Sequence, residues 1–177
     1  MLMKSLFLAF VVLSSALAGA SELYSDSQTD FSQEQGANGW RYLYWDGVNK
    51  TQELEWQQET RKWALGDGGI WIGGMHPIST KAYIVREWTC PESGSVQIEG
   101  KGELFLDAAG VTLIIVRNYD MDHPLWTKEL DANQSEQFSI QATVAKGDTL
   151  DFMIVGKDGV GIRNDSTAWL FAISPAK

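Results

Sequence analysis

The chain of 177 residues has one cysteine, two histidines and no long hydrophobic run after its first twenty residues. Because Cys90 is alone, no internal disulfide can form, and its place at the end of an apolar run predicts a small buried thiol. The two histidines, His76 and His123, each precede a proline and lack the spacing of a zinc site. No Gly-x-Ser-x-Gly elbow is present either. These absences argue against zinc-dependent and serine-dependent hydrolysis.

Basic residues are also scarce. Lysine and arginine number 14 against 23 aspartates and glutamates, which gives a net charge of −9. An acidic surface disfavours nucleic acid, anionic membranes and strongly anionic polysaccharides unless basic residues gather locally. No such cluster is visible along the sequence, so a polysaccharide partner is predicted to be neutral.

The N-terminus has the pattern of an export signal. Lys4 provides the positive charge, residues 6–13 the apolar run, and Ala18-Gly19-Ala20 a cleavage site of small residues. The apolar run is shorter than the roughly 20 residues that a membrane-spanning helix needs. Residues 1–20 are therefore predicted to be a signal peptide, and the mature protein to be secreted, extracellular or periplasmic, without membrane insertion.

The rest of the chain predicts a polar leader over residues 21–30 and one β-domain over residues 31–177. Residues 111–116 are apolar apart from Thr112, as in a strand buried on both faces, whereas residues 138–144 alternate apolar and polar, as in a strand with one wet face. Turn signals separate the short runs, and no amphipathic helix is evident. The predicted strands are 40–45, 52–56, 82–88, 95–101, 111–116, 125–130, 138–144, 149–155 and 166–173. The fold class is all-β: an antiparallel β-sandwich of jelly-roll type in a single domain.

What the chain has in abundance is tryptophan, with eight residues. Indole rings fill cores, and they also stack on the apolar faces of sugar rings. Trp40, Trp88 and Trp169 lie within strand patterns and are predicted to be core, whereas Trp126 fits either role. Residues 49–71 interleave tryptophans with charged and amide side chains, which predicts a surface segment. The predicted ligand-binding residues are Trp56, Trp63, Trp71, Tyr44, Arg61, Arg163 and Asp165.

The glycine-rich loop at residues 157–165 is open to two interpretations. Arg163, Asn164 and Asp165 could present a fork of donors and acceptors to a ligand. Alternatively, the segment is a hairpin loop in which the Asp165 carboxylate caps the backbone.

Several motifs in the second half of the chain occur in a recognisable order. They are VREWTCP at 85–91, SGSVQIEG at 93–100, KGDTLDF at 146–152 and DSTAW at 165–169, after an opening with Phe31-Ser32 and Asn38-Gly39-Trp40. Together they resemble the jelly-roll carbohydrate-binding modules that accompany secreted bacterial polysaccharide-degrading enzymes. The resemblance implies carbohydrate binding without naming the sugar. It also implies a structural calcium, for which Asp30 and Asp165 are candidate ligands, although no spacing fixes the ligand set.

The sequence thus predicts a secreted, non-catalytic protein that binds a polysaccharide or oligosaccharide by aromatic stacking and polar contacts. One alternative is a structural or adhesion protein whose aromatic patch binds another protein. Another is a small polysaccharide lyase or glycoside hydrolase, since paired carboxylates could in principle cut a glycosidic bond. The basic residues are too scattered along the sequence to favour a lyase.

Overall fold

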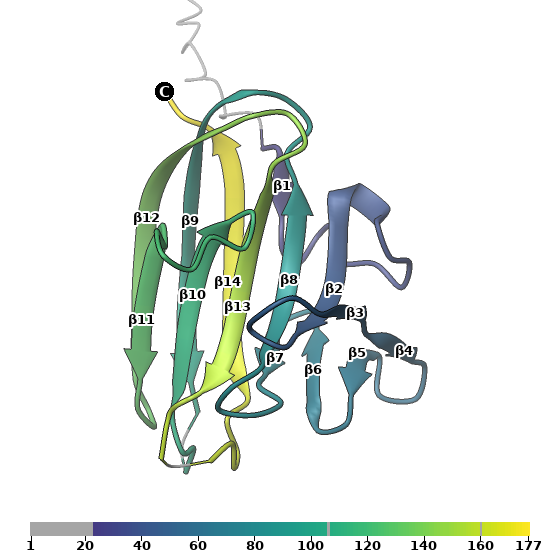
Figure 1. Cartoon of the computed structure of the whole chain (residues 1–177), viewed down its shortest axis with the longest axis vertical. Helices are drawn as coiled ribbons and strands as arrows, with labels where there is room; N and C mark the ends of the chain where they lie inside the picture. The colour runs from purple at the N-terminus through teal and green to yellow at the C-terminus, as the bar shows by residue number, and fades with distance from the viewer. Residues whose placement is uncertain (1–22, 106, 160) are drawn as a thin grey trace, which may run out of the picture.

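The computed structural model describes residues 23–105, 107–159 and 161–177, so the predicted signal peptide lies outside the described residues. Two antiparallel sheets face each other as a sandwich, and short hairpin strands lie beside the long ones (Figure 1). A single 3₁₀ turn, Ala37–Gly39, precedes the first long strand. Within the described ranges, no helix has the length and apolar character needed to cross a membrane.

The larger sheet has eight strands, and its two longest members, β9 and β12, pair over ten residues. Its order is β12 (Ser135–Val144), β9 (Gly94–Leu104), β14 (Thr167–Pro175), β7 (Gly74–His76), β6 (Gly68–Trp71), β5 (Lys62–Leu65) and β4 (Glu55–Gln57), with β1 (Ser25–Asp26) pairing to β14.

The smaller sheet has six strands. Its order is β11 (Trp126–Leu130), β10 (Val111–Arg117), β13 (Thr149–Gly156), β8 (Tyr83–Thr89), β2 (Trp40–Trp45) and β3 (Thr51–Glu53). The chain passes from one sheet to the other between β8, β9 and β10, and again between β12, β13 and β14. This repeated crossing confirms the predicted antiparallel sandwich.

Two segments differ from the sequence prediction. Residues 52–56 form two strands in different sheets, β3 and β4, because the chain changes sheets at the buried Leu54. The polar leader is partly structural: β1 pairs with β14, and the buried Ser25 accepts a hydrogen bond from the Trp40 indole at 2.7 Å. The leader was read as loop because its short polar side chains do not alternate with apolar ones.

The main core lies between the sheets. Trp40, Trp88 and Trp169 are buried in it, as predicted, and the rings of Phe152 and Phe171 stack with centroids 3.7 Å apart. Burying a large apolar side chain stabilises the fold by about 1.5–3 kcal/mol. Burial of these side chains stabilises the sandwich without a disulfide. Cys90 is a free, buried cysteine, and burial raises the pKa of its thiol to about 11.

A second apolar layer covers the outer face of the smaller sheet. It includes Trp45, Val116 and Met153, which are buried beneath Tyr83 and Tyr119. Side chains of β10 and β13 are thus buried on both faces, as the apolar run at 111–116 predicted.

Candidate functional site

The register of strands β5, β6 and β7 creates an outward-facing surface on the larger sheet. Trp63 pairs with Ile70 and Ile70 with Met75, and these three side chains point into the core. Since side chains alternate along a strand, the neighbouring Lys62 and Trp71 point to the outer face.

Small residues line the floor of this outer face. Trp71 pairs with Gly74, and Gly69 pairs with His76, so both large side chains stand opposite glycines. A Cβ on Gly74 would lie 2.8 Å from Cζ2 of Trp71 and would also collide with the carbonyl of Thr167. The indole therefore packs directly over the Gly74 backbone, and only glycine leaves room for it.

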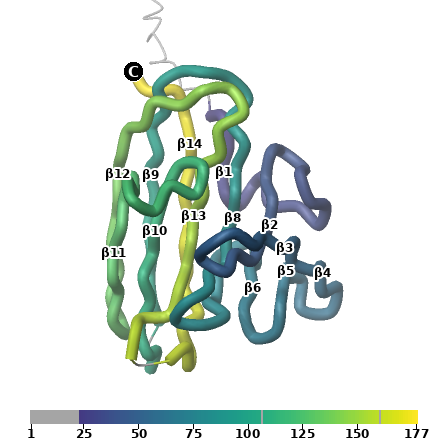
Figure 2. The backbone as a smooth tube through the Cα atoms, viewed as in Figure 1, coloured from purple at the N-terminus to yellow at the C-terminus, as the bar shows by residue number. Residues whose placement is uncertain are grey.

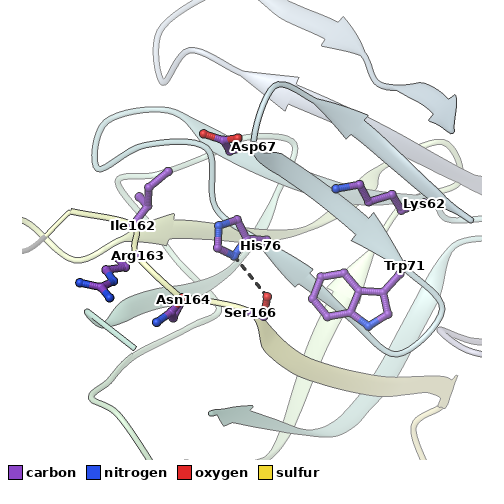
Figure 3. Close-up of a pocket in the computed structure, with 8 residues that line it drawn as sticks. All are labelled: Lys62, Asp67, Trp71, His76, Ile162, Arg163, Asn164 and Ser166. Carbon is purple, nitrogen blue, oxygen red and sulfur yellow. Dashed lines mark hydrogen bonds between the residues drawn. The ribbon is translucent and has the colours of Figure 1, made fainter. Parts of the chain in front are cut away.

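An open cleft of about 580 Å³ lies over this floor, and we call it the outer-face cleft. Lys62 and Trp71 lie to one side of His76, and the loop that leads into β14 lies to the other (Figure 3). The lining residues are Lys62, Asp67, Trp71, His76, Ile162, Arg163, Asn164 and Ser166.

Polar groups of several kinds surround the half-buried Trp71. His76 Nδ1 lies 3.4 Å from Oγ of Ser166, the contact drawn as a dashed line in Figure 3. Burial lowers the pKa of His76, so the imidazole is neutral at neutral pH. Arg163 and Asn164 are exposed, and Asn164 has a left-handed backbone with φ 59°. The cleft can thus donate and accept hydrogen bonds around an aromatic face.

A buried arginine fixes the backbone at Trp71. Arg86 is 1% exposed and donates from Nη2 to the Trp71 carbonyl at 2.8 Å and from Nη1 to the Ser27 carbonyl at 2.9 Å. Its guanidinium lies 5.6 Å from the Phe31 ring centroid and 5.7 Å from that of Phe171. Burial lowers the pKa of Arg86 to about 10, so the side chain stays charged at neutral pH. Two carbonyl dipoles and two ring faces stabilise that charge.

A second cleft, of about 410 Å³, lies at the end of the β4–β5 and β6–β7 turns, and we call it the end cleft. Its lining residues are Phe31, Ser32, Gln33, Trp56, Thr60, Arg61 and Ile72. The rings of Trp56 and Phe31 lie 6.2 Å apart, and Ile72 is 54% exposed. The segment before β2, purple in Figure 2, supplies Phe31, Ser32 and Gln33 to this cleft, and the Ser32 carbonyl accepts a hydrogen bond from Nε1 of Trp63 on β5.

Residues that are neighbours in the sequence line different clefts. Arg61 lines the end cleft and Lys62 lines the outer-face cleft; likewise, Ile72 lines the end cleft and Trp71 lines the outer-face cleft. Trp56 pairs with the inward-facing Trp63, so the end cleft includes a side chain from the core face of the larger sheet.

Comparison with known proteins gives likenesses of fold alone. No protein-family model matches the chain, and no curated protein matches it in sequence. The similar solved structures are mostly carbohydrate-binding modules, the kind of module that the motifs resemble. One, described as "CBM4 structure and function", has a TM-score of 0.39 and 11% identity over 64% of this chain and 77% of that one.

Two further solved structures show that proteins of different kinds share this likeness of fold. A carbohydrate-binding module from Cellvibrio mixtus lichenase 5A, in complex with cellotriose, has a TM-score of 0.36 and 13% identity over 88% of this chain and all (100%) of that one. Pika GITRL has a TM-score of 0.34 and 11% identity over 77% of this chain and 96% of that one. The function therefore has to come from the chemistry of the clefts.

The predicted ligand-binding residues divide into two groups in the structure. Trp71 and Arg163 meet in the outer-face cleft, and Trp56 and Arg61 meet in the end cleft. Tyr44 lines neither cleft; it is half-buried and packs against the main core.

For Trp63 and Asp165, the prediction of an exposed, ligand-binding side chain is wrong, because both are buried. Trp63 is 5% exposed, lies 5.1 Å from the Tyr42 ring in a stacked arrangement and donates from Nε1 to the Ser32 carbonyl. Asp165 is fully buried, and its Oδ1 accepts hydrogen bonds from the N–H groups of Ala109 and Gly110. Asp165 therefore follows the alternative interpretation, in which its carboxylate caps the backbone.

Sequence reasoning missed half of the outer-face cleft, namely Lys62, Asp67, His76 and Ser166. The proline after His76 favours a turn, yet His76 is the last residue of β7. The one available signal was alternation: if Trp63 and Ile70 are inside, then Lys62 must be outside.

The two calcium candidates do not come together around a common point. Asp30 accepts hydrogen bonds from the Ser25 hydroxyl and the Asp26 N–H, whereas Asp165 binds the backbone at Ala109 and Gly110. In the described part of the chain, no three carboxylate, histidine or cysteine side chains group as metal ligands. Asp30 and Asp165 therefore do not share one metal site.

Proposed function

We propose that the chain is a secreted carbohydrate-binding protein that takes a polysaccharide in the outer-face cleft, with the Trp71 indole as its stacking platform. The observation that carries this proposal is the position of Trp71. Its half-buried ring lies against Gly74 at the side of an open cleft, among side chains that can bind hydroxyl groups.

A sugar ring matches this arrangement of surfaces. One face of a pyranose is a layer of C–H groups, which can cover an indole while the ring hydroxyls project sideways. Burying such a contact contributes about 1–3 kcal/mol, which corresponds to roughly five- to 150-fold in affinity. Asn164 and Ser166 offer donors and acceptors for the hydroxyls, and the Asp67 carboxylate offers an acceptor.

The cleft supports binding better than cleavage. Hydrolysis of a glycosidic bond generally uses two carboxyl groups on either side of the bond. Of the residues that line the outer-face cleft, Asp67 alone has a carboxylate. Secretion is part of the proposal because the N-terminal twenty residues have the pattern of an export signal.

The test is affinity electrophoresis and calorimetry of residues 21–177 against a panel of neutral and acidic polysaccharides. Trp71→Ala should lower the affinity for the bound polysaccharide by about tenfold or more, because it removes the stacking surface. Trp126→Ala is the matched control: Trp126 is also half-buried but lies over Phe138, outside both clefts. Equal affinities of the Trp71→Ala variant and the unchanged protein, with both folded, would contradict the proposal.

A protein partner at the end cleft is a second candidate function. The exposed Ile72 stands beside Trp56 and Phe31, and this apolar group is open to solvent. Such a group suits an apolar side chain of a partner as well as it suits a sugar. Ile72→Ser should then abolish capture of the partner and leave polysaccharide affinity unchanged.

A further inference from the structure

The charge of the outer-face cleft is opposite in sign to the charge of the chain. The protein as a whole has a net charge of −9. Lys62 and Arg163 nevertheless line the cleft, against the single carboxylate of Asp67, and the His76 imidazole beside them is neutral at neutral pH. Arg61, the next residue along the chain from Lys62, lines the end cleft, which has no acidic side chain among its lining residues.

The cations at these clefts have no carboxylate partners. Arg61, Lys62 and Arg163 form no ion pair with any residue in the described ranges, and no hydrogen bond of their side chains is seen there. Arg41, Lys101, Lys128 and Lys157 pair with acidic residues, whereas Lys50, Lys81 and Lys146 form no ion pair within the described ranges. What distinguishes Lys62 and Arg163 from the other unpaired cations is that both line the same cleft.

The position of Lys62 suits an anion above Trp71. A Cβ on Gly69 would lie 3.5 Å from Cδ of Lys62, so the aliphatic stem of the lysine runs over the glycine. Its ammonium group extends along the same side of the cleft as Trp71, while Arg163 comes from the opposite loop (Figure 3). A sugar stacked on the indole would therefore lie on the same side of the cleft as Lys62, with Arg163 across the cleft, beyond His76.

We infer that the polysaccharide is acidic, with uronate residues whose carboxylates lie between Lys62 and Arg163. This inference rests on the proposed function and names the class of ligand. Arginine binds a carboxylate with two parallel N–H donors, and lysine binds it as a point charge. Charges more than about 8 Å away are screened at physiological salt, so the distant surface acids weaken this attraction little.

The experiment compares each of a panel of polyuronates with its own carboxyl-reduced form, in which the chain is the same but the charge is gone. The protein should bind at least one polyuronate about tenfold or more tightly than its reduced form. This preference should shrink as ionic strength rises from about 0.01 M to about 1 M, where the screening length falls from roughly 30 Å to roughly 3 Å.

Two substitutions locate the effect. Lys62→Met keeps the apolar stem over Gly69 and removes the charge, and Arg163→Gln keeps a hydrogen-bonding side chain. Each should lower the affinity for the polyuronate about tenfold more than it lowers the affinity for the reduced form. Lys81→Met removes the same charge from an exposed loop outside the outer-face cleft and should change neither affinity.

The outcomes separate this inference from the proposed function. If the acidic and reduced forms bind equally well, and Trp71→Ala still lowers the affinity for both, the inference of an acidic ligand is overturned and the proposed carbohydrate binding stands. If a folded sample binds neither acidic nor neutral polysaccharides, the proposed function itself is overturned.

Discussion

The pH dependence of stability should be governed by a carboxyl group far from the clefts, Asp151. It lies on β13 directly opposite Glu87 on β8, on the outer face of the smaller sheet. Both are buried, and Tyr119 lies between them and solvent. The Tyr119 N–H donates to Asp151 Oδ2 at 2.8 Å, and its hydroxyl donates to Glu87 at 2.9 Å. Burial is the main cause that raises the pKa of Asp151 from 3.8 to about 7.

This raised pKa means that the folded protein keeps a proton that the unfolded chain releases. The contribution of Asp151 to the free energy of unfolding is therefore largest below about pH 4, falls as pH rises from about 4 to about 7, and is level above that. A shift of about three pKa units corresponds to about 4 kcal/mol. That is a large part of the 5–15 kcal/mol by which domains of this kind are stable.

Asp151→Asn tests this reasoning because the amide cannot ionise and still offers an oxygen to the Tyr119 N–H. Oδ1 of Asp151 has no partner among the described residues, so any cost of placing the amide nitrogen there should be the same at every pH. The free energy of unfolding of each protein is measured by urea unfolding, followed by tryptophan fluorescence. The value for the variant minus the value for the unchanged protein should increase by up to about 4 kcal/mol between pH 4 and pH 8.

The difference between the two proteins removes the contribution of other carboxylates. Asp148, for example, accepts a hydrogen bond from the Ala145 N–H that lowers its pKa, so it contributes stability that is lost as pH falls. A difference that stays constant with pH would show that Asp151 ionises in the folded protein as it does in the unfolded chain, and would refute the reasoning.

Two further predictions concern the outer-face cleft. Burial lowers the pKa of His76 despite nearby acidic groups, so the imidazole gains charge only as pH falls below 6.5. The affinity for a polyuronate should therefore increase as pH is lowered from about 7 to about 5. His76→Gln should remove this rise, and an unchanged pH profile would contradict it. Gly74→Ala should displace Trp71, weaken polysaccharide binding and cost about 1–3 kcal/mol in stability by overpacking. Gly94→Ala, where an added Cβ meets nothing within 4 Å, is the matched control for both measurements.

The long strands could be predicted from the sequence because their patterns are strong. The run at 111–116 and the alternation at 138–144 each occur in the structure as expected. The short strands β5, β6 and β7 were missed because three or four residues are too few for a period to show, and because glycines and charges interrupt them. They are held in place by pairing with one another and with β14, which no local pattern reports.

Trp63 shows why the site was only half predicted. Its charged neighbours suggested exposure, yet in a strand the residues on either side of a buried position face solvent. Lys62 is outside for the same reason that Trp63 is inside. Trp71 and Arg163 were both predicted to bind ligand, but nothing in the sequence could show that they share a cleft, because the pairing of β14 with β7 brings them together.

The same pairing explains why the net charge of the chain does not describe the charge of the outer-face cleft. Net charge counts every ionisable group equally, whereas a bound sugar responds mainly to the groups within about one screening length. Lys62, His76 and Arg163 belong to three separate segments, so they are no cluster in the sequence and become one only when β5, β7 and the loop before β14 are assembled. An acidic surface around a basic cleft would also repel acidic polymers from everywhere except the cleft, so the net charge of −9 can add selectivity instead of excluding such a ligand.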